Sequence, residues 1–120
     1  LNKIFKGLDT FSDVINNSKY ANNYYYNKSI FLINKDIFLD NGYFILKEDP
    51  RLYAPISCAF YEFYDDIKDL KSKLHDIRGN LQCIVSKKRS LKAISYGSTQ
   101  NPSFHDYADN IDTIEFLINI

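Results

Sequence analysis

The sequence predicts a small α/β fold in which two N-terminal helices precede a strand, a helix and a second strand in a mostly parallel sheet. Three patterns lead to this prediction. Apolar residues recur at helical spacing near the N-terminus, an Asn-Gly pair precedes a short apolar run, and a long apolar segment is followed by an amphipathic stretch and a further apolar run. With 120 residues, 45% of them hydrophobic, the chain can bury one core, so we predict a single domain over residues 1–120.

Two helices are expected before residue 35. The first is indicated by apolar residues three or four positions apart, namely Phe5, Leu8, Phe11 and Ile15. The second is expected within residues 18–35, where one face carries Tyr20, Tyr24, Asn27 or Lys28, and Phe31.

Two strands are expected in the middle of the chain. Asn41-Gly42 is a strong turn dipeptide, and the apolar run YFIL at residues 43–46 follows it as a strand of ordinary length. Residues 56–63 carry apolar side chains on both faces, which is typical of a central strand buried on two sides.

An amphipathic helix is expected over residues 65–77, and Gly79 is placed to end it in a left-handed cap. The run LQCIV at residues 81–85 is interpreted as another strand. Strand, helix and strand with short joints predict a parallel pair with a right-handed crossover. The basic run SKKRS that follows is interpreted as a solvated loop rather than a phosphate contact.

The net charge and the cysteine content of the chain limit the binding partners and the cellular compartment that we expect. Fifteen basic and fifteen acidic side chains give a formal net charge of zero, which disfavours a nucleic-acid partner. No apolar run approaches the roughly 20 residues that span a bilayer. Cys58 and Cys83 lie in apolar runs and are interpreted as buried, reduced side chains, so a cytoplasmic location is expected.

The C-terminal segment holds the residues that most suggest a site. A metal centre would use His105, Asp106, Asp109 and Asp112, but the segment lacks a calcium-loop pattern and has one imidazole. We therefore interpret the acids as helix caps, with Ser103 and Asp106 as one pair and Asp112 and Glu115 as another, and predict no metal site.

Nucleophilic catalysis within this chain would require Cys58 or Cys83, activated by His75 or His105. Both cysteines are expected in the middle of strands, where access is poor, and the four glycines are too scattered for a phosphate loop. No catalytic residue is predicted, and a small cysteine hydrolase built on Cys58 and His105 is the weakest hypothesis.

The order of the segments resembles a known family. Residues 47–87, KEDPRLYAPISCAFYEFYDDIKDLKSKLHDIRGNLQCIVSK, are similar to a segment of the aldehyde dehydrogenase superfamily in which an aromatic-small-Pro step opens a strand. The flanks YANNYYYNKSIFLINK and YGSTQNPSFHDYADNIDTIEFL resemble the C-terminal part of bacterial acyl-CoA reductases related to the fatty-acid reductase subunit of the luminescence system.

This resemblance implies that the chain is the C-terminal portion of a larger aldehyde-dehydrogenase-like catalytic domain. That domain would reduce a fatty acyl-CoA thioester to an aldehyde with NADPH, through an acyl-cysteine intermediate. The nucleophilic cysteine and the dinucleotide-binding part would precede residue 1. The C-terminal acids would then belong to a final turn and strand.

Within the chain, the resemblance points to Arg51, Tyr53 and Pro55 as the residues nearest the cofactor. The family usually has a glutamate for the nicotinamide ribose where this sequence has Arg51, and Ala54 replaces a glycine. Arginine cannot accept hydrogen bonds from ribose hydroxyls, although it can meet a phosphate, so Arg51 is either a phosphate contact or an ordinary surface residue.

The alternative to the reductase is a free-standing small α/β binding or interaction module without catalysis. A homo-oligomer through the terminal run IEFLINI is a further expectation from relatives of aldehyde dehydrogenases, which often pair through C-terminal elements.

Overall fold

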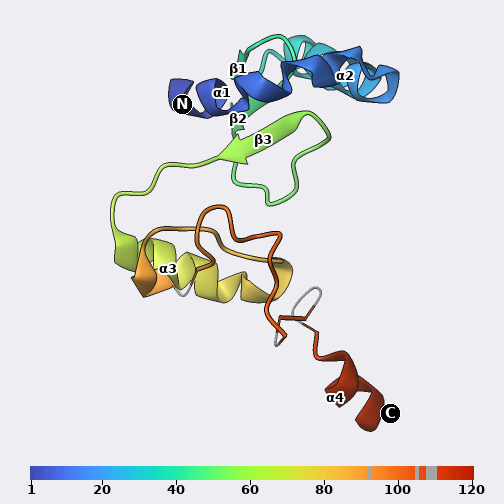
Figure 1. The fold of residues 1–120 in the computed structure, drawn as a ribbon. Helices are drawn as coiled ribbons and strands as arrows, with labels where there is room; N and C mark the ends of the chain where they lie inside the picture. Colours follow the sequence, from blue (N-terminus) through green and yellow to red (C-terminus); the bar gives the residue numbers. More distant parts are fainter. Residues whose placement is uncertain (92, 105, 108–110) are drawn as a thin grey trace. The chain divides into compact units, whose positions relative to one another are not determined.

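The computed structural model describes residues 1–91, 93–104, 106–107 and 111–120 (Figure 1). The chain divides into two compact units, Leu1–Phe63 and Tyr64–Ile120, and each is described by itself. Over the described residues the fold is a small α/β arrangement of four α-helices and a three-stranded mixed sheet, together with short 3-10 helices.

The first unit begins with α1 (Asn2–Leu8), which passes directly into the 3-10 helix η1 (Asp9–Asn16). The prediction of one continuous helix from residue 5 to residue 15 is therefore wrong in its second half. In the tighter 3-10 geometry the side chains turn by about 120° per residue instead of 100°, so the α-helical apolar stripe is not maintained. Phe11, predicted on the buried face, is 64% exposed.

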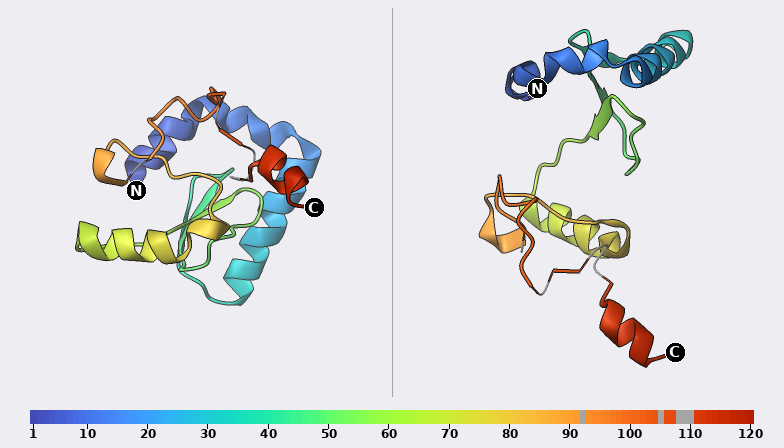
Figure 2. Two further views of the ribbon diagram at one scale, coloured as in Figure 1. Left: turned by 90° about the horizontal axis from the view of Figure 1, so that it is seen from below. Right: turned by 45° about the vertical axis from the view of Figure 1, so that its right-hand side comes forward.

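Helix α2 (Ser18–Ile33) begins at Asn17, whose side-chain oxygen accepts hydrogen bonds from the backbone N–H groups of Lys19 and Tyr20. Tyr24, Asn27 and Phe31 are buried, which confirms the predicted face of this helix. Because these positions lie three or four residues apart, they form one stripe along the helix. Figure 2 shows α2 running beside the strands of the same unit.

The sheet consists of β1 (Phe38–Asp40), β2 (Ile45–Glu48) and β3 (Cys58–Tyr61), in that spatial order. β1 and β2 are antiparallel, whereas β2 and β3 are parallel, so the sheet is mixed rather than mostly parallel. The segment predicted as the central strand forms the edge strand β3, and β2 holds the centre. Its Ile45 and Leu46, which point to opposite faces, are both buried.

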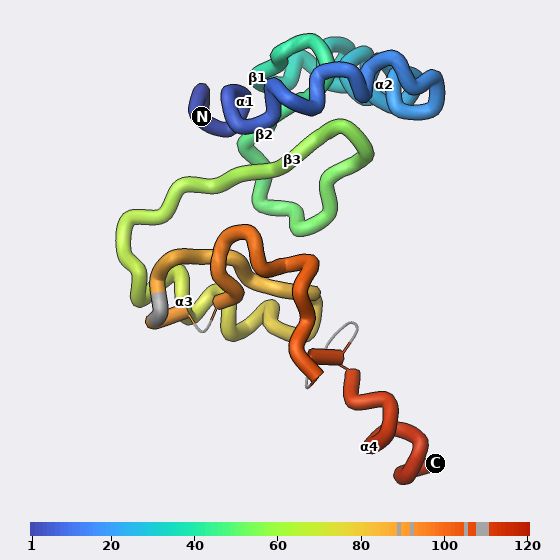
Figure 3. The backbone as a smooth tube through the Cα atoms, in the orientation of Figure 1, coloured from blue at the N-terminus to red at the C-terminus, as the bar shows by residue number. Residues whose placement is uncertain are grey.

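The β1–β2 hairpin turns at the predicted Asn41-Gly42 pair, and Figure 3 traces the backbone through both strands. Gly42 has a φ of +96°, a conformation that glycine adopts without strain. The Asn41 side chain accepts hydrogen bonds from the N–H groups of Tyr43 and Phe44. β1 itself was not predicted, because its three residues are too short to show a period.

The core of this unit lies between α2 and one face of the sheet. Tyr24 and Phe31 of the helix pack with Ile45 of the central strand. Side chains alternate between the two faces of a strand, so the residue two positions from Ile45 on β2 shares its face. The residues of β1 and β3 that pair with these two positions lie on the same face. They include Phe38, Cys58 and Phe60, all packed against this cluster.

The second unit contains α3 (Ile67–Asp76), the 3-10 helices η2 (Arg78–Asn80) and η3 (Arg89–Leu91), and α4 (Thr113–Ile118). The predicted amphipathic helix is confirmed as α3. Gly79, however, lies inside η2 and does not have a positive φ, so the predicted left-handed cap is wrong.

Residues 81–85 do not form the predicted strand. The described part of this segment makes a single parallel bridge, between Val85 and Ile94, and no ladder. The expected strand-helix-strand unit is therefore absent from the described residues, and the parallel pair is instead β2 and β3, joined by a loop without a helix. An apolar run becomes a strand only where a neighbouring strand satisfies its backbone groups.

The terminal run that the family resemblance placed in a strand forms the helix α4. Its N-cap is Asp112, whose carboxylate accepts hydrogen bonds from the N–H groups of Ile114 and Glu115, as the capping interpretation predicted. Asp106 likewise accepts a hydrogen bond from the N–H of Ser103, but no helix is assigned at Ser103.

Candidate functional site

A groove in the first unit lies where the two parallel strands end. The carboxyl ends of β2 and β3 meet at the same edge of the sheet, and β1 begins there. The carboxyl edge of parallel strands is where α/β sheets commonly bind ligands. The groove is lined by Leu1, Lys35, Asp36, Ile37, Phe38, Leu39, Lys47, Glu48, Asp49, Pro50, Tyr61, Glu62 and Phe63.

Lys47 holds the two sides of this groove together. Its Nζ lies 3.0 Å from Oδ2 of Asp49 and 3.3 Å from Oδ2 of Asp36, which precedes β1. The ammonium also lies 5.2 Å from the centre of the Phe31 ring, a cation–π distance. Burial alone would lower the pKa of Lys47, but the hydrogen bonds to Asp49 and Asp36 outweigh it and raise the pKa, so this side chain stays charged.

Asp49 is also held by Arg51. Nε and Nη2 of Arg51 donate to the two carboxylate oxygens at 2.8 and 2.7 Å, and the backbone N–H of Arg51 donates at 3.1 Å. These bonds, with that of Lys47, hold the pKa of the Asp49 carboxyl well below its usual range. The guanidinium carbon lies 5.0 Å from the centre of the Phe60 ring, so Arg51 is fixed over β3 as well.

The four charges compensate one another. Asp36 and Asp49 carry two negative charges, and Lys47 and Arg51 carry two positive ones, so the cluster is neutral. A phosphate that approached Arg51 would have to displace a bidentate carboxylate, which is a strong interaction. The cluster therefore joins β2 to the segments before β1 and before β3, and it offers no uncompensated cation to an anionic ligand.

The three residues predicted to lie near the cofactor do not form a cradle. Arg51 is bound to Asp49, Tyr53 is 76% exposed, and Pro55 uses its carbonyl to accept a hydrogen bond from the N–H of Cys58. Among the described residues, no hydrogen bond, ion pair or ring contact joins these three side chains to one another. The assignment of these three residues to a cofactor stays a prediction.

A second polar cluster lies on the core side of the sheet and was not predicted. The Tyr24 hydroxyl donates to Oδ1 of Asp40 at 2.6 Å, and the Lys28 ammonium forms an ion pair with Oδ2 of the same carboxylate. The N–H of Gly42 also donates to Asp40, at 2.8 Å. The spacing of Tyr24 and Lys28 on one helix face was visible in the sequence, but their partner lies on β1, a strand the sequence did not reveal.

The pKa shifts of this second cluster favour the protonation states that its hydrogen bonds require. Burial, followed by the hydrogen bond to Asp40, raises the pKa of Tyr24 to about 12, so the hydroxyl remains a donor at neutral pH. Burial would raise the pKa of Asp40, but hydrogen bonds from Lys28, Tyr24 and Gly42 lower it overall, so the carboxylate remains charged. A general base or nucleophile would need the opposite shift at the tyrosine.

The cysteines and the C-terminal acids give no catalytic arrangement among the described residues. Cys58 is half-buried, and burial raises the pKa of its thiol, while Cys83 is exposed rather than buried as predicted. His105 and Asp109, which the sequence suggested for a site, lie outside the described residues. Within the part of the chain that is described, no group of three or more His, Cys, Asp or Glu side chains is placed to hold a metal ion.

The described helices include none with the length and apolar character needed to cross a membrane. Comparison with known proteins returned no matching family model, no matching curated protein and no matching solved structure.

Proposed function

We propose that this chain acts as a binding module that docks an apolar polypeptide segment in the groove at the carboxyl ends of β2 and β3, without chemistry of its own. The observation that carries this proposal is the exposure of large apolar side chains around the groove. Ile37 is 92% exposed and Phe63 is 74% exposed, and both line it together with Leu39.

The groove has exposed apolar side chains, such as Ile37 and Phe63, beside the paired charges of Lys47 and Asp49. Contiguous exposed apolar surface marks interaction sites, because covering it gains about 25 cal/mol for each Å² removed from water. The charged side chains of Asp36, Lys47 and Asp49 in the groove are already paired with one another and with Arg51. An extended segment with apolar side chains fits such a groove better than an anionic metabolite does.

The proposal predicts that copies of the chain associate weakly through this groove when no partner is present. Ile37→Asp and Phe63→Asp place charges at exposed positions, so folding is preserved while association is lost. Sedimentation equilibrium over micromolar to near-millimolar protein measures this effect. Tyr26→Asp is the matched control, since Tyr26 is exposed on α2 and does not line the groove.

A monomer at every concentration would contradict this proposal, as would equal losses in the Tyr26→Asp control. Ile118→Asp tests the competing expectation of association through the terminal run 114–120. If that variant alone abolishes association, the interface belongs to α4 and the groove plays no part in it.

A second proposal keeps the reductase: the chain is the C-terminal portion of an acyl-CoA reductase, and the groove packs against the rest of that catalytic domain. The observation that favours it is the same exposed apolar rim, which the loss of a covering domain accounts for. In this proposal NADPH and fatty acyl-CoA are bound mainly outside residues 1–120.

The reductase proposal is tested on the longer protein that it requires. We expect oxidation of NADPH that depends on a fatty acyl-CoA and that disappears when the nucleophilic cysteine preceding residue 1 is changed to alanine. A full-length product that never consumes NADPH in the presence of acyl-CoA would remove this proposal and leave the binding module.

A further inference from the structure

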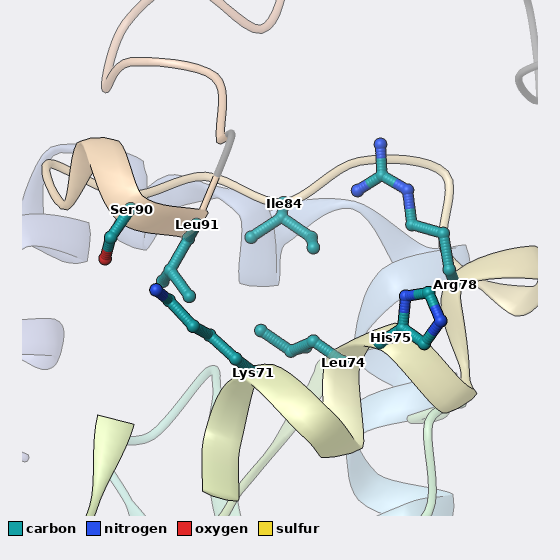
Figure 4. Close-up of a pocket in the computed structure, with 7 residues that line it drawn as sticks. All are labelled: Lys71, Leu74, His75, Arg78, Ile84, Ser90 and Leu91. Carbon is teal, nitrogen blue, oxygen red and sulfur yellow. The ribbon is translucent and has the colours of Figure 1, made fainter. Parts of the chain in front are cut away.

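A pocket in the second unit has a composition unlike that of the groove. It lies between α3 and the segment that contains η3, and Figure 4 shows the side chains that line it. Leu74 and Ile84 face each other across its base, with Lys71 on one side and His75 and Arg78 on the other. Leu91 and Ser90 of η3 close the end near Lys71.

The basic side chains of the pocket come from α3 and from η2, which follows it. Lys71 and His75 are four residues apart on α3, so they share one face of that helix, and Arg78 is the first residue of η2. The acids of α3, Asp69 and Asp76, fall at roughly the opposite side of the same helix. Lys73 lies on the side of these two acids, but no acid of α3 lies on the face that carries Lys71 and His75.

Lys71 and Arg78 differ from Lys47 and Arg51 in their ion pairs with the carboxylates that the structure describes. Among the described residues, neither Lys71 nor Arg78 forms a salt bridge. Both side chains are exposed, as is His75, so each can reach a ligand from solvent. The pocket thus offers two cations that form no salt bridge within the described part of the chain.

The base of the pocket is apolar and half-buried. Leu74, Ile84 and Leu91 all have intermediate burial, so they are partly covered by the protein and partly open toward the pocket. A ligand that places an apolar ring or chain on this base removes that surface from water. Cations around an apolar base select a molecule with an anionic head and an apolar body.

We propose that this pocket binds a small organic phosphate with an apolar body. Arg78 and His75, three residues apart, donate to the phosphate, and a guanidinium suits its oxygens because it can donate two parallel hydrogen bonds. The apolar body lies on Leu74, Ile84 and Leu91. Lys71 and Ser90 provide donors for a polar substituent at the far end.

The test uses phenyl phosphate as the probe and the full chain labelled with ¹⁵N, at constant ionic strength. We expect saturable chemical-shift changes confined to residues 71–91. Arg78→Gln weakens binding by roughly tenfold, because it removes a charge-assisted contact. Lys73→Gln is the matched control, since it removes the same charge from the other side of α3. An unchanged ¹H–¹⁵N spectrum in the remaining residues verifies that each variant is folded.

Inorganic phosphate distinguishes the two halves of the site. We expect it to bind more weakly than phenyl phosphate, and Ile84→Ala to reduce this preference. Equal affinity for both probes would overturn the assignment of the apolar base. Shifts that do not saturate, or equal weakening by Lys73→Gln and Arg78→Gln, would show nonspecific attraction to positive charge and would overturn the site.

Discussion

At the scale of single residues, Tyr24 shows how a buried hydroxyl links stability to pH. Its pKa is about 12 in the folded chain and about 10 in an unfolded one. Between these values the unfolded state loses the proton while the folded state retains it. Stability therefore falls as pH rises through this window, by up to about 1.4 kcal/mol per pH unit.

The variant Tyr24→Phe should lose this dependence. At neutral pH it removes the hydrogen bond to Asp40 and lowers the free energy of unfolding by about 1 kcal/mol. Asp40 keeps Lys28 and the N–H of Gly42 as partners, so the carboxylate is not left unpaired. Urea unfolding at pH 9 and at about pH 11.5 should show the gap between wild type and variant shrinking and then changing sign. A gap that is constant with pH would contradict the shift.

Removing the hydroxyl of Tyr43 is expected to raise the stability of the fold, whereas removing that of Tyr24 lowers it. The residue is buried, and its hydroxyl finds no hydrogen-bond partner among the described residues. A buried, unpaired polar group costs about 1–3 kcal/mol relative to its hydrated state. Tyr43→Phe should therefore raise the melting temperature, measured by circular dichroism. The Tyr20→Phe control should lower it, because that hydroxyl donates to the Tyr43 carbonyl at 2.9 Å. A loss of stability in Tyr43→Phe would show that the hydroxyl is satisfied in solution.

The candidate site was the part least accessible to sequence reasoning at this scale. Arg51 was interpreted as either a phosphate contact or a surface residue, and the structure gives it a bidentate bond to Asp49. The two residues are close in sequence, but the pairing depends on how the chain turns after β2. The ion pairs of Lys47 could not be predicted from the sequence either, because its two partners come from different segments that only the folded sheet brings together.

At the scale of elements, the long periodic segments were predicted well. α2 and α3 each carry a stripe of residues at helical spacing, which remains visible whatever they pack against. The short elements were not predicted from the sequence. β1 spans three residues and η1 interrupts a helical pattern, while residues 81–85 have the composition of a strand but form only one bridge. Those outcomes depend on pairing partners, and local composition does not encode such partners.

The C-terminus of α2 offers a test of element-level strain. Lys35 has a φ of +59° and forms the left-handed cap of a Schellman motif. In this motif the N–H of Asp36 donates to the Phe31 carbonyl, and that of Lys35 to the Leu32 carbonyl. A side chain makes this conformation unfavourable, whereas glycine adopts it freely.

Lys35→Gly should therefore stabilise the chain by about 0.5–1 kcal/mol, although glycine destabilises most helical positions. Chemical denaturation measures the change. Lys28→Gly is the contrasting control, because Lys28 lies inside α2 and pairs with Asp40, and it should lose well over 1 kcal/mol. Equal destabilisation by both variants would show that Lys35 is not in the left-handed region.

At the scale of the whole molecule, stability is distributed unevenly. The buried residues of the described chain, including Tyr24, Phe31 and Ile45, all belong to Leu1–Phe63. Within Tyr64–Ile120 no described residue is buried; α3 has a cap and half-buried apolar residues, whereas α4 has a cap and exposed apolar residues. Segments with few buried contacts open locally at low free-energy cost, without unfolding of the core.

Native-state hydrogen exchange of the full chain should therefore separate two classes of amide. The N–H groups of α2 and β2 should exchange slowest, with protection that approaches the free energy of global unfolding, because exposing them breaks the Tyr24–Phe31–Ile45 core. Those of α3 should exchange faster and with little dependence on denaturant, since their opening exposes little surface. Truncating the core with Phe31→Ala should lower protection in α2 and β2 and leave α3 unchanged. Equal protection of α3 and α2 in the wild type would mean that the second unit unfolds only with the first.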